Sequence, residues 1–223
     1  MEKSSDVHSQ HSAPSFEASS QDLHLQSKMK TVRTVDTARV GVTALALLMG
    51  LSVLGVSANT LRVHHNTNIS SDYFLPLWPE EFSIRPTMAL VAGSVFVVVS
   101  SILSLAFSNV SSLRSKQTAH TSLTFASPVV GLIAALVAVI LFYSINASNT
   151  VDTFTSWTCR WRHVSMSQQP RWDTLCQQSY AGLYLAILLI PVEVIALGLA
   201  AFQVKLERYT ERYEGAKASP ALS

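Results

Sequence analysis

Four long apolar runs restrict this chain to very few architectures. They cover residues 40–58, 88–107, 128–145 and 180–202. A helix of about 20 residues crosses a hydrocarbon core of roughly 30 Å, so each run is long enough to span a membrane. None shows the one-sided polar stripe of a helix at the surface of a soluble protein. A soluble bundle would have to hide all four, so we predict four membrane spans.

The composition agrees with this prediction. Only 13% of the 223 residues are charged, against about 25% in a soluble domain. The net charge of +2 gives no indication of a nucleic-acid partner. No stretch between the runs reaches the roughly 100–150 residues of an independent soluble domain. The predicted fold class is therefore all-α: an integral membrane four-helix bundle whose chemistry is built from its own helices and loops.

The chain divides into three predicted segments. Residues 1–38 are polar and rich in serine, and a disordered tail is expected because burial there cannot offset the entropy cost of ordering. Its polar start does not match a cleavable signal peptide. Residues 39–208 form the four-span membrane domain, and residues 209–223 form a second tail.

The positive charges predict the orientation, because cytoplasmic loops carry an excess of Lys and Arg. One side holds ten of them near the spans and the other holds five. Both termini are therefore expected in the cytoplasm, in the plasma membrane or the secretory pathway. The ten are Lys28, Lys30, Arg33, Arg39, Arg114, Lys116, Lys205, Arg208, Arg212 and Lys217, and the five are Arg62, Arg85, Arg160, Arg162 and Arg171.

Both cysteines, Cys159 and Cys176, fall in the loop before the fourth span, which is predicted to lie outside. Disulfides persist in oxidising compartments, so we predict that these two residues pair and close the loop. The alternative is two separately buried thiols. All four tryptophans also lie in the outer loops, as expected for residues that favour the membrane interface.

Around Cys159 the loop alternates aromatic and basic residues. In an extended chain Arg160 and Arg162 share one face, while Trp157, Cys159 and Trp161 share the other. One interpretation is a recognition surface for a partner or a lipid head group, formed by Trp157, Arg160, Trp161 and Arg162. The other is a disulfide-closed lid that seals the bundle.

Glu193 is the only ionisable residue deep within a span, and it follows Pro191. An acid in the membrane is costly and is therefore a functional candidate. Glu193 could bind a proton or face a substrate. Alternatively, it could hold helices together by hydrogen bonds to Ser and Thr side chains of other spans.

Histidines and carboxylates gather in the outer loops and could form a metal or acid–base site. Their spacing matches no metal motif, and adjacent histidines point apart, so solvated loop residues are expected and neither a metal nor a cofactor is predicted. The residues are His64, His65, Asp72, Glu80, Glu81, Asp152, His163 and Asp173.

Asn68 begins a glycosylation acceptor in the first outer loop. Asn146 fits the same pattern but lies at the end of the third run, too close to the membrane to be modified. Asn109 is predicted on the cytoplasmic side, where it would stay unmodified.

Pairs of small residues four apart recur in the runs and allow helices to approach closely. They predict a compact bundle and favour self-association. The pairs are Ala46 and Gly50, Ala89 and Gly93, Ser100 and Ser104, Gly131 and Ala135, and Gly182 and Ala186.

With four spans and paired cysteines in the second outer loop, the chain resembles tetraspan families such as the MARVEL-type proteins. Residues 149–166 and 175–203 also resemble uncharacterised four-span membrane proteins of filamentous fungi. The likeness covers about residues 40–208. The chain departs from claudin-like proteins, because its first outer loop has no cysteine, and it lacks the cysteine-rich large loop of tetraspanins.

The resemblance implies a membrane-organising or accessory role and transfers no catalytic residue. We therefore expect a non-enzymatic protein that organises or scaffolds lipids or partner proteins, with membrane lipids, membrane proteins or further copies of itself as partners. The alternative is a membrane-embedded enzyme or accessory protein of a fungal secondary-metabolite pathway, acting on a lipophilic substrate. A small transporter is a third hypothesis.

Overall fold

The computed structural model describes residues 14–68, 77–109, 117–147 and 151–218, and most of these residues are helical. Two short strands complete the fold. The helices are α1 (Pro14–Thr67), α2 (Arg85–Asn109), α4 (Gln117–Ala147), α5 (Phe154–Arg160) and α6 (Trp172–Ala218), and the strands are β1 (Phe82–Ser83) and β2 (Asp152–Thr153). The all-α prediction is confirmed.

Four helices are long and apolar enough to cross a membrane, and each contains one of the predicted runs. The apolar stretches lie within Arg33–Thr67 of α1, Arg85–Ser108 of α2, Phe125–Ala147 of α4 and Trp172–Leu206 of α6. They confirm an integral membrane protein with four candidate spans.

The side-chain distribution is the reverse of that in a soluble bundle. In the apolar 18-residue stretch of each span, no more than 33% is buried inside the protein. Large apolar side chains such as Leu48 and Ile140 are each 62% exposed. Polar side chains, including Ser101 and Glu193, are buried between the helices together with apolar ones such as Val97. Lipid is the solvent that accepts such an apolar exterior.

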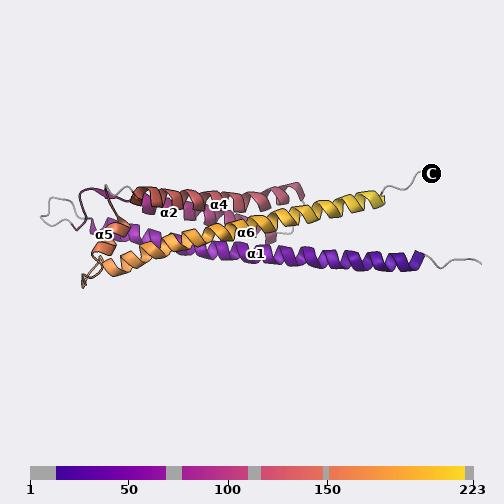
Figure 1. The fold of residues 1–223 in the computed structure, drawn as a ribbon, viewed down its shortest axis with the longest axis horizontal. Helices are drawn as coiled ribbons and strands as arrows, with labels where there is room; N and C mark the ends of the chain where they lie inside the picture. Colours follow the sequence, from indigo (N-terminus) through magenta and orange to yellow (C-terminus); the bar gives the residue numbers. More distant parts are fainter. Residues whose placement is uncertain (1–13, 69–76, 110–116, 148–150, 219–223) are drawn as a thin grey trace, which may run out of the picture.

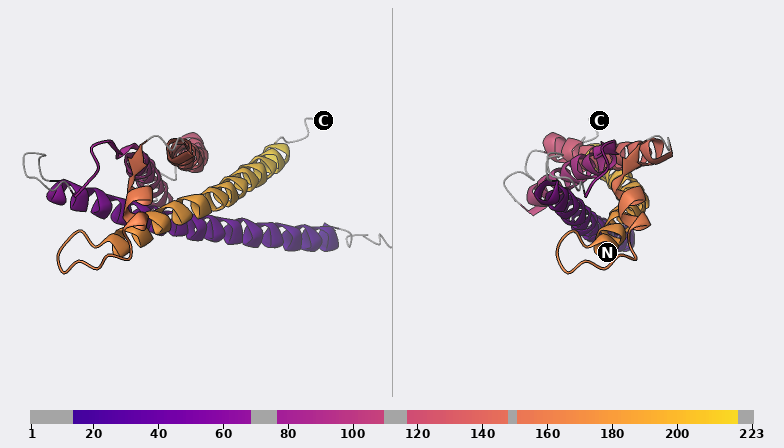
Figure 2. Two further views of the ribbon diagram at one scale, coloured as in Figure 1. Left: turned by 60° about the vertical axis from the view of Figure 1, so that its left-hand side comes forward. Right: turned by 90° about the vertical axis from the view of Figure 1, so that its left-hand side faces the viewer.

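The four long helices form a ring in which each one packs mainly against two neighbours, and α2 also touches α6 across the ring. α1 packs against α2 and α6, and α4 packs against the same two helices. α5 and the strands lie at one end of the ring, and α1 and α6 run past α2 and α4 at the other end (Figure 1). There α1 and α6 diverge (Figure 2).

One glycine lies at each of the four contacts between neighbouring helices around the ring. Gly50 contacts α2 from α1, Gly93 contacts α4 from α2, Gly131 contacts α6 from α4, and Gly182 contacts α1 from α6. A Cβ atom built at Gly93 would lie only 2.8 Å from the Cβ of Ala138. The ring is therefore closed by small residues, as in other membrane bundles.

The predicted small-residue pairs explain most of these contacts. Three of the five pairs are buried at both positions, namely Ala46 with Gly50, Gly131 with Ala135, and Gly182 with Ala186. Ala89, Ser100 and Ser104 are only partly buried. The compact bundle is confirmed, and self-association stays a prediction.

Helix α1 begins much earlier than the first apolar run. It starts at Pro14, so residues 14–38, for which disorder was predicted, are helical here. Proline suits the first position of a helix, and neither glycine nor proline interrupts residues 15–40. α6 likewise continues to Ala218, into the predicted second tail. The predictions for residues 1–13 and 219–223 lie outside the described residues.

Candidate functional site

The end of the ring that carries α5 is closed by two segments far apart in the sequence. We call residues 77–84 and 151–171 together the cap. β1 of the first segment pairs in parallel with β2 of the second, with Phe82 opposite Asp152 and Ser83 opposite Thr153. The two loops therefore form one unit on top of the helices.

The sequence around Thr153 starts a helix at this point. The Thr153 side chain accepts a hydrogen bond from the Ser156 backbone N–H, and the Ser156 hydroxyl accepts one from the Thr153 backbone N–H. This reciprocal pair is a capping box, which satisfies free N–H groups at a helix start. The Thr153 hydroxyl also donates to Oδ1 of Asn146 at the end of α4. α5 is thus nucleated locally and attached to the bundle.

The extended arrangement considered for residues 157–162 is wrong, because residues 157–160 belong to α5. In a helix, residues three and four apart are neighbours. The Trp157 and Trp161 rings accordingly lie 5.8 Å apart, and the Arg160 guanidinium lies 5.7 Å from the Trp157 ring centroid. Arg160 also pairs with Asp152 at 3.1 Å. Aromatic and basic groups therefore share one face instead of separating.

The predicted disulfide is confirmed. Cys159 of α5 is bonded to Cys176 in the second turn of α6, with their Cα atoms 4.9 Å apart. Cys176 is buried. The bond fixes α5 to a membrane-crossing helix and closes the loop between them.

An aromatic cluster joins the cap to α1. Phe82, Trp78 and Phe154 pack edge to face with one another at centroid distances of 4.9–5.6 Å. The His64 ring of α1 stacks on Phe82 at 5.1 Å, and Trp172 of α6 meets Trp78 at 5.2 Å. Aromatic pairs of this kind contribute about 0.5–1.5 kcal/mol each beyond the area they bury.

The cluster corrects the expectation for His64. This residue is half-buried in α1 and not a solvated loop residue, whereas His65 beside it is exposed. Sequence reasoning missed His64 because the apolar run ends at Ala58, six residues earlier. The helix continues to Thr67, and Thr67 accepts a 3.0 Å hydrogen bond from Nε1 of Trp78.

The other histidines and acids considered for a metal are dispersed. Glu80, Glu81 and His163 are exposed, and Asp173 accepts a hydrogen bond from Gln177. Asp72 lies outside the described residues. Over the described part of the chain, no three His, Cys, Asp or Glu side chains come together in a group that could hold a metal ion.

A continuous exposed segment follows α5. All of residues 161–169 are exposed, including the apolar side chains of Trp161, Val164 and Met166. Within it, Nε of Arg162 donates to Nε2 of His163 at 3.1 Å. Of the predicted recognition residues, Trp161 and Arg162 lie here, while Trp157 of α5 is partly buried against the aromatic cluster.

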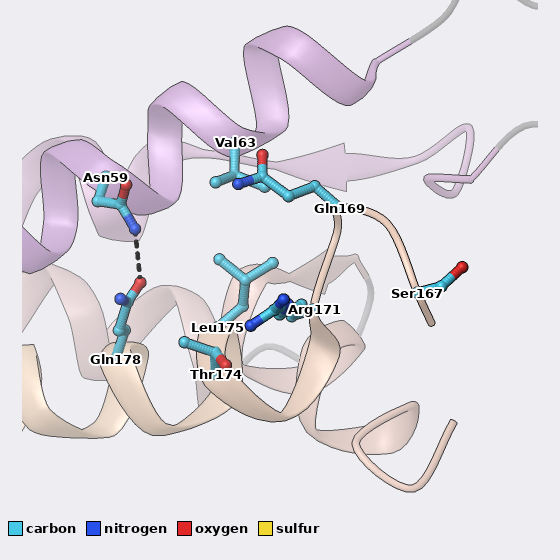
Figure 3. Close-up of a pocket in the computed structure, with 8 residues that line it drawn as sticks. All are labelled: Asn59, Val63, Ser167, Gln169, Arg171, Thr174, Leu175 and Gln178. Atoms are coloured by element: carbon cyan, nitrogen blue, oxygen red, sulfur yellow. Dashed lines mark hydrogen bonds between the residues drawn. The ribbon is translucent and has the colours of Figure 1, made fainter. Parts of the chain in front are cut away.

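A pocket of about 450 Å³ lies between this segment and the start of α6. Figure 3 shows, at the left of the lining residues, the hydrogen bond in which Asn59 of α1 donates to Gln178 of α6 at 3.0 Å. Six of the eight lining residues are of polar type, and the eight are Asn59, Val63, Ser167, Gln169, Arg171, Thr174, Leu175 and Gln178. Sequence reasoning did not identify these residues, because common polar residues more than 100 positions apart carry no motif.

Glu193 lies away from the cap, inside the ring. It is 3% exposed and faces α4. A Cβ built at Gly131 would lie 2.5 Å from Oε1 of Glu193, so the carboxyl group rests directly on the glycine. Among the described residues, no Ser or Thr of another span forms a hydrogen bond with this carboxyl group, so the partner suggested by the sequence is not observed.

The glycosylation candidates differ in structure. Asn68 is exposed directly after α1, while the remaining two acceptor positions lie outside the described residues. Nδ2 of Asn146 instead donates to the Phe142 carbonyl at 2.9 Å, and its Oδ1 accepts from Thr153. The side chain of Asn109 is outside the described part of the chain.

Together the ring and the cap define a class: a four-span helical membrane protein with a disulfide-linked cap. A family model matches residues 6–218, and the chain belongs to that family, described as a domain of unknown function (DUF8762). No curated protein and no solved structure matches the chain.

Proposed function

We propose that this is a non-enzymatic tetraspan protein that organises or scaffolds membrane lipids or partner proteins through its cap. The observation that carries the proposal is the contrast within the cap. A disulfide and an aromatic cluster fix it to the helices, and a strand pair joins its two segments, yet residues 161–169 are all exposed. A rigid base that presents exposed aromatic, aliphatic and basic side chains suits recognition, because little order is lost on binding.

The cap is proposed to face out of the cytoplasm, with both termini inside, in the plasma membrane or secretory pathway of a filamentous fungus. The excess of Lys and Arg on the side of the termini supports this orientation. So does the disulfide, which persists in oxidising compartments.

The test is purification from mild detergent of the wild type and of a Trp161→Ser/Val164→Ser variant. Both substituted side chains are exposed, so the bundle and the disulfide should be kept. We expect the lipids and proteins retained by the wild type to be depleted in the variant. An Ile140→Ala variant is the matched control, because Ile140 is an exposed apolar residue on α4. Identical retained sets in all three proteins would contradict a role for the cap.

A second candidate function rests on Glu193. A membrane-embedded enzyme or accessory protein acting on a lipophilic substrate could use this buried acid. A Glu193→Gln variant that keeps the fold but lets a pathway intermediate accumulate would support it. Full activity in that variant would remove it. The close contact with Gly131 favours a packing role, because it leaves the carboxyl group no space toward α4.

A further inference from the structure

The pocket beside Arg171 has the size and lining of a ligand site. Its volume of about 450 Å³ falls in the range of roughly 300–1,000 Å³ seen for small-molecule sites. Val63 and Leu175 are buried and form an apolar base. The side-chain amides of Asn59, Gln169 and Gln178 provide hydrogen-bond donors around it.

The electrostatics of the pocket select an anion. Arg171 is the one charged residue among the eight that line it, and none of the eight is acidic. Asp173 accepts a hydrogen bond from Gln177 and does not line the pocket. Within the described part of the chain Arg171 forms no ion pair, and Figure 3 shows its side chain beside Leu175. A guanidinium offers several N–H donors in a fork that fits phosphate oxygens.

The pocket lies at the ends of the first and fourth apolar runs, which is where lipid head groups are expected. Asn59 follows directly on the first apolar run, and Gln178 lies two residues before the fourth. Tyr180 and Tyr184 are exposed just below, with stacked rings 6.0 Å apart. Tyrosines are enriched at membrane–water interfaces. The polar pocket therefore opens where the apolar surface begins.

Below the pocket, one face of α1 is suited to an acyl chain. Gly55, Ser52 and Leu48 follow Asn59 at helical spacing, so all four share this face. All four are exposed, and a Cβ at Gly55 would meet nothing within 4 Å. The face thus continues from the polar pocket into open apolar surface.

We propose that this pocket binds the phosphate-bearing head group of a membrane phospholipid, with Arg171 holding the phosphate and an acyl chain lying along Gly55 and Leu48. This assignment rests on the proposed lipid-organising function and identifies its ligand class. It also moves the phosphate contact from Arg160 and Arg162, where the sequence suggested it, to Arg171.

The test uses the full chain, delipidated in detergent, with three probes. These are dioleoyl phosphatidylglycerol, dioleoylglycerol and glycerol 3-phosphate. Binding is read by native mass spectrometry and by the rise in melting temperature. We expect the phospholipid to bind, and we expect the two probes that lack either phosphate or chains to bind at least tenfold more weakly.

Two variants locate the site. Arg171→Gln removes the charge and should weaken phospholipid binding at least tenfold. Thr174→Phe keeps the charge, fills the pocket from an exposed position, and should do the same. Arg62→Gln is the matched control, an exposed arginine near the same end of α1 that does not line the pocket. It should bind like the wild type.

Equal phospholipid binding by wild type, Arg171→Gln and Thr174→Phe would overturn the assignment. Equal binding of dioleoylglycerol would overturn the role of phosphate, and equal binding of glycerol 3-phosphate would show a soluble ligand in place of a lipid. The proposed function fails separately. If Arg171→Gln binds lipid normally while the Trp161 variant loses its partners, only the pocket assignment falls.

Discussion

The carboxyl group of Glu193 lies directly against the backbone of Gly131. A Cβ at Gly131 would be 2.5 Å from Oε1 and 2.7 Å from Cδ of Glu193. Both distances are far shorter than any van der Waals contact. The pair lies at the contact between α4 and α6, so the acid and the glycine together determine how closely these two helices approach.

Gly131→Ala should therefore destabilise the bundle. The new methyl group must displace Glu193 or separate α4 from α6, and overpacking of this kind costs about 1–3 kcal/mol. The cost should exceed the helix-propensity gain of roughly 0.5–1 kcal/mol that alanine brings over glycine. Thermal unfolding in detergent would show it as a lower melting temperature.

Gly198→Ala is the matched control, because Gly198 is an exposed residue of α6 and a Cβ built there would meet nothing within 4 Å. That variant should match or exceed the wild type in stability. Adding Glu193→Ala to Gly131→Ala should recover part of the loss, since contacting residues are energetically coupled. Equal melting temperatures of Gly131→Ala and Gly198→Ala would refute the contact.

Opening the disulfide should loosen the cap but leave the four spans in place. Cys159 and Cys176 are 17 residues apart, and closing a loop of about this length stabilises a protein by about 3 kcal/mol. A Cys159→Ser/Cys176→Ser variant should keep its helical circular dichroism while protease cuts residues 161–169 faster. Unchanged mobility of the wild type on gels with and without reductant, together with unchanged proteolysis of the variant, would contradict a structural disulfide.

Trp78 should be the residue on which the cap depends most. It is buried, contacts four aromatic or imidazole rings, and donates a hydrogen bond to Thr67. Trp78→Ala should cost about 3–5 kcal/mol. Trp78→Phe keeps an aromatic ring but loses the hydrogen bond, and should cost about 1 kcal/mol for that bond alone. Trp161→Ala, at an exposed position, should change the melting temperature little. The loss of melting temperature should therefore be largest for Trp78→Ala, smaller for Trp78→Phe and smallest for Trp161→Ala, and any other order would be evidence against the cluster.

The spans and the disulfide were predictable for different physical reasons. A membrane span can be recognised from the local sequence alone, because about 20 successive apolar residues are needed to cross the hydrocarbon core. The disulfide followed from having two cysteines in one loop. Residues 157–162 show where such reasoning fails. Their alternation resembles a strand, but the capping box formed by Thr153 and Ser156 starts a helix.

The pocket could not be predicted, and the reason is geometric. Asn59 and Gln178 are separated by 119 positions, and only the packing of α1 on α6 brings them within hydrogen-bond distance. His64 was misjudged for a similar reason. Its partners Trp78, Phe82 and Phe154 come from two loops, and their meeting depends on the pairing of β1 with β2.

The proposed orientation makes a specific prediction about glycosylation. If the cap faces the lumen or the exterior, Asn68 should carry a glycan, because it is exposed beyond the end of α1. Asn146 should not, because its amide is bonded to the Phe142 carbonyl and to Thr153 next to the bundle. Treatment with an endoglycosidase should increase the gel mobility of the wild type and of Asn146→Gln, but not that of Asn68→Gln. If the wild type carries no glycan, the orientation is tested by labelling a single cysteine on intact cells. The protein for this test combines Ser167→Cys with Cys159→Ser and Cys176→Ser. Labelling of Ser167→Cys only after permeabilisation would place the cap in the cytoplasm and reverse the orientation.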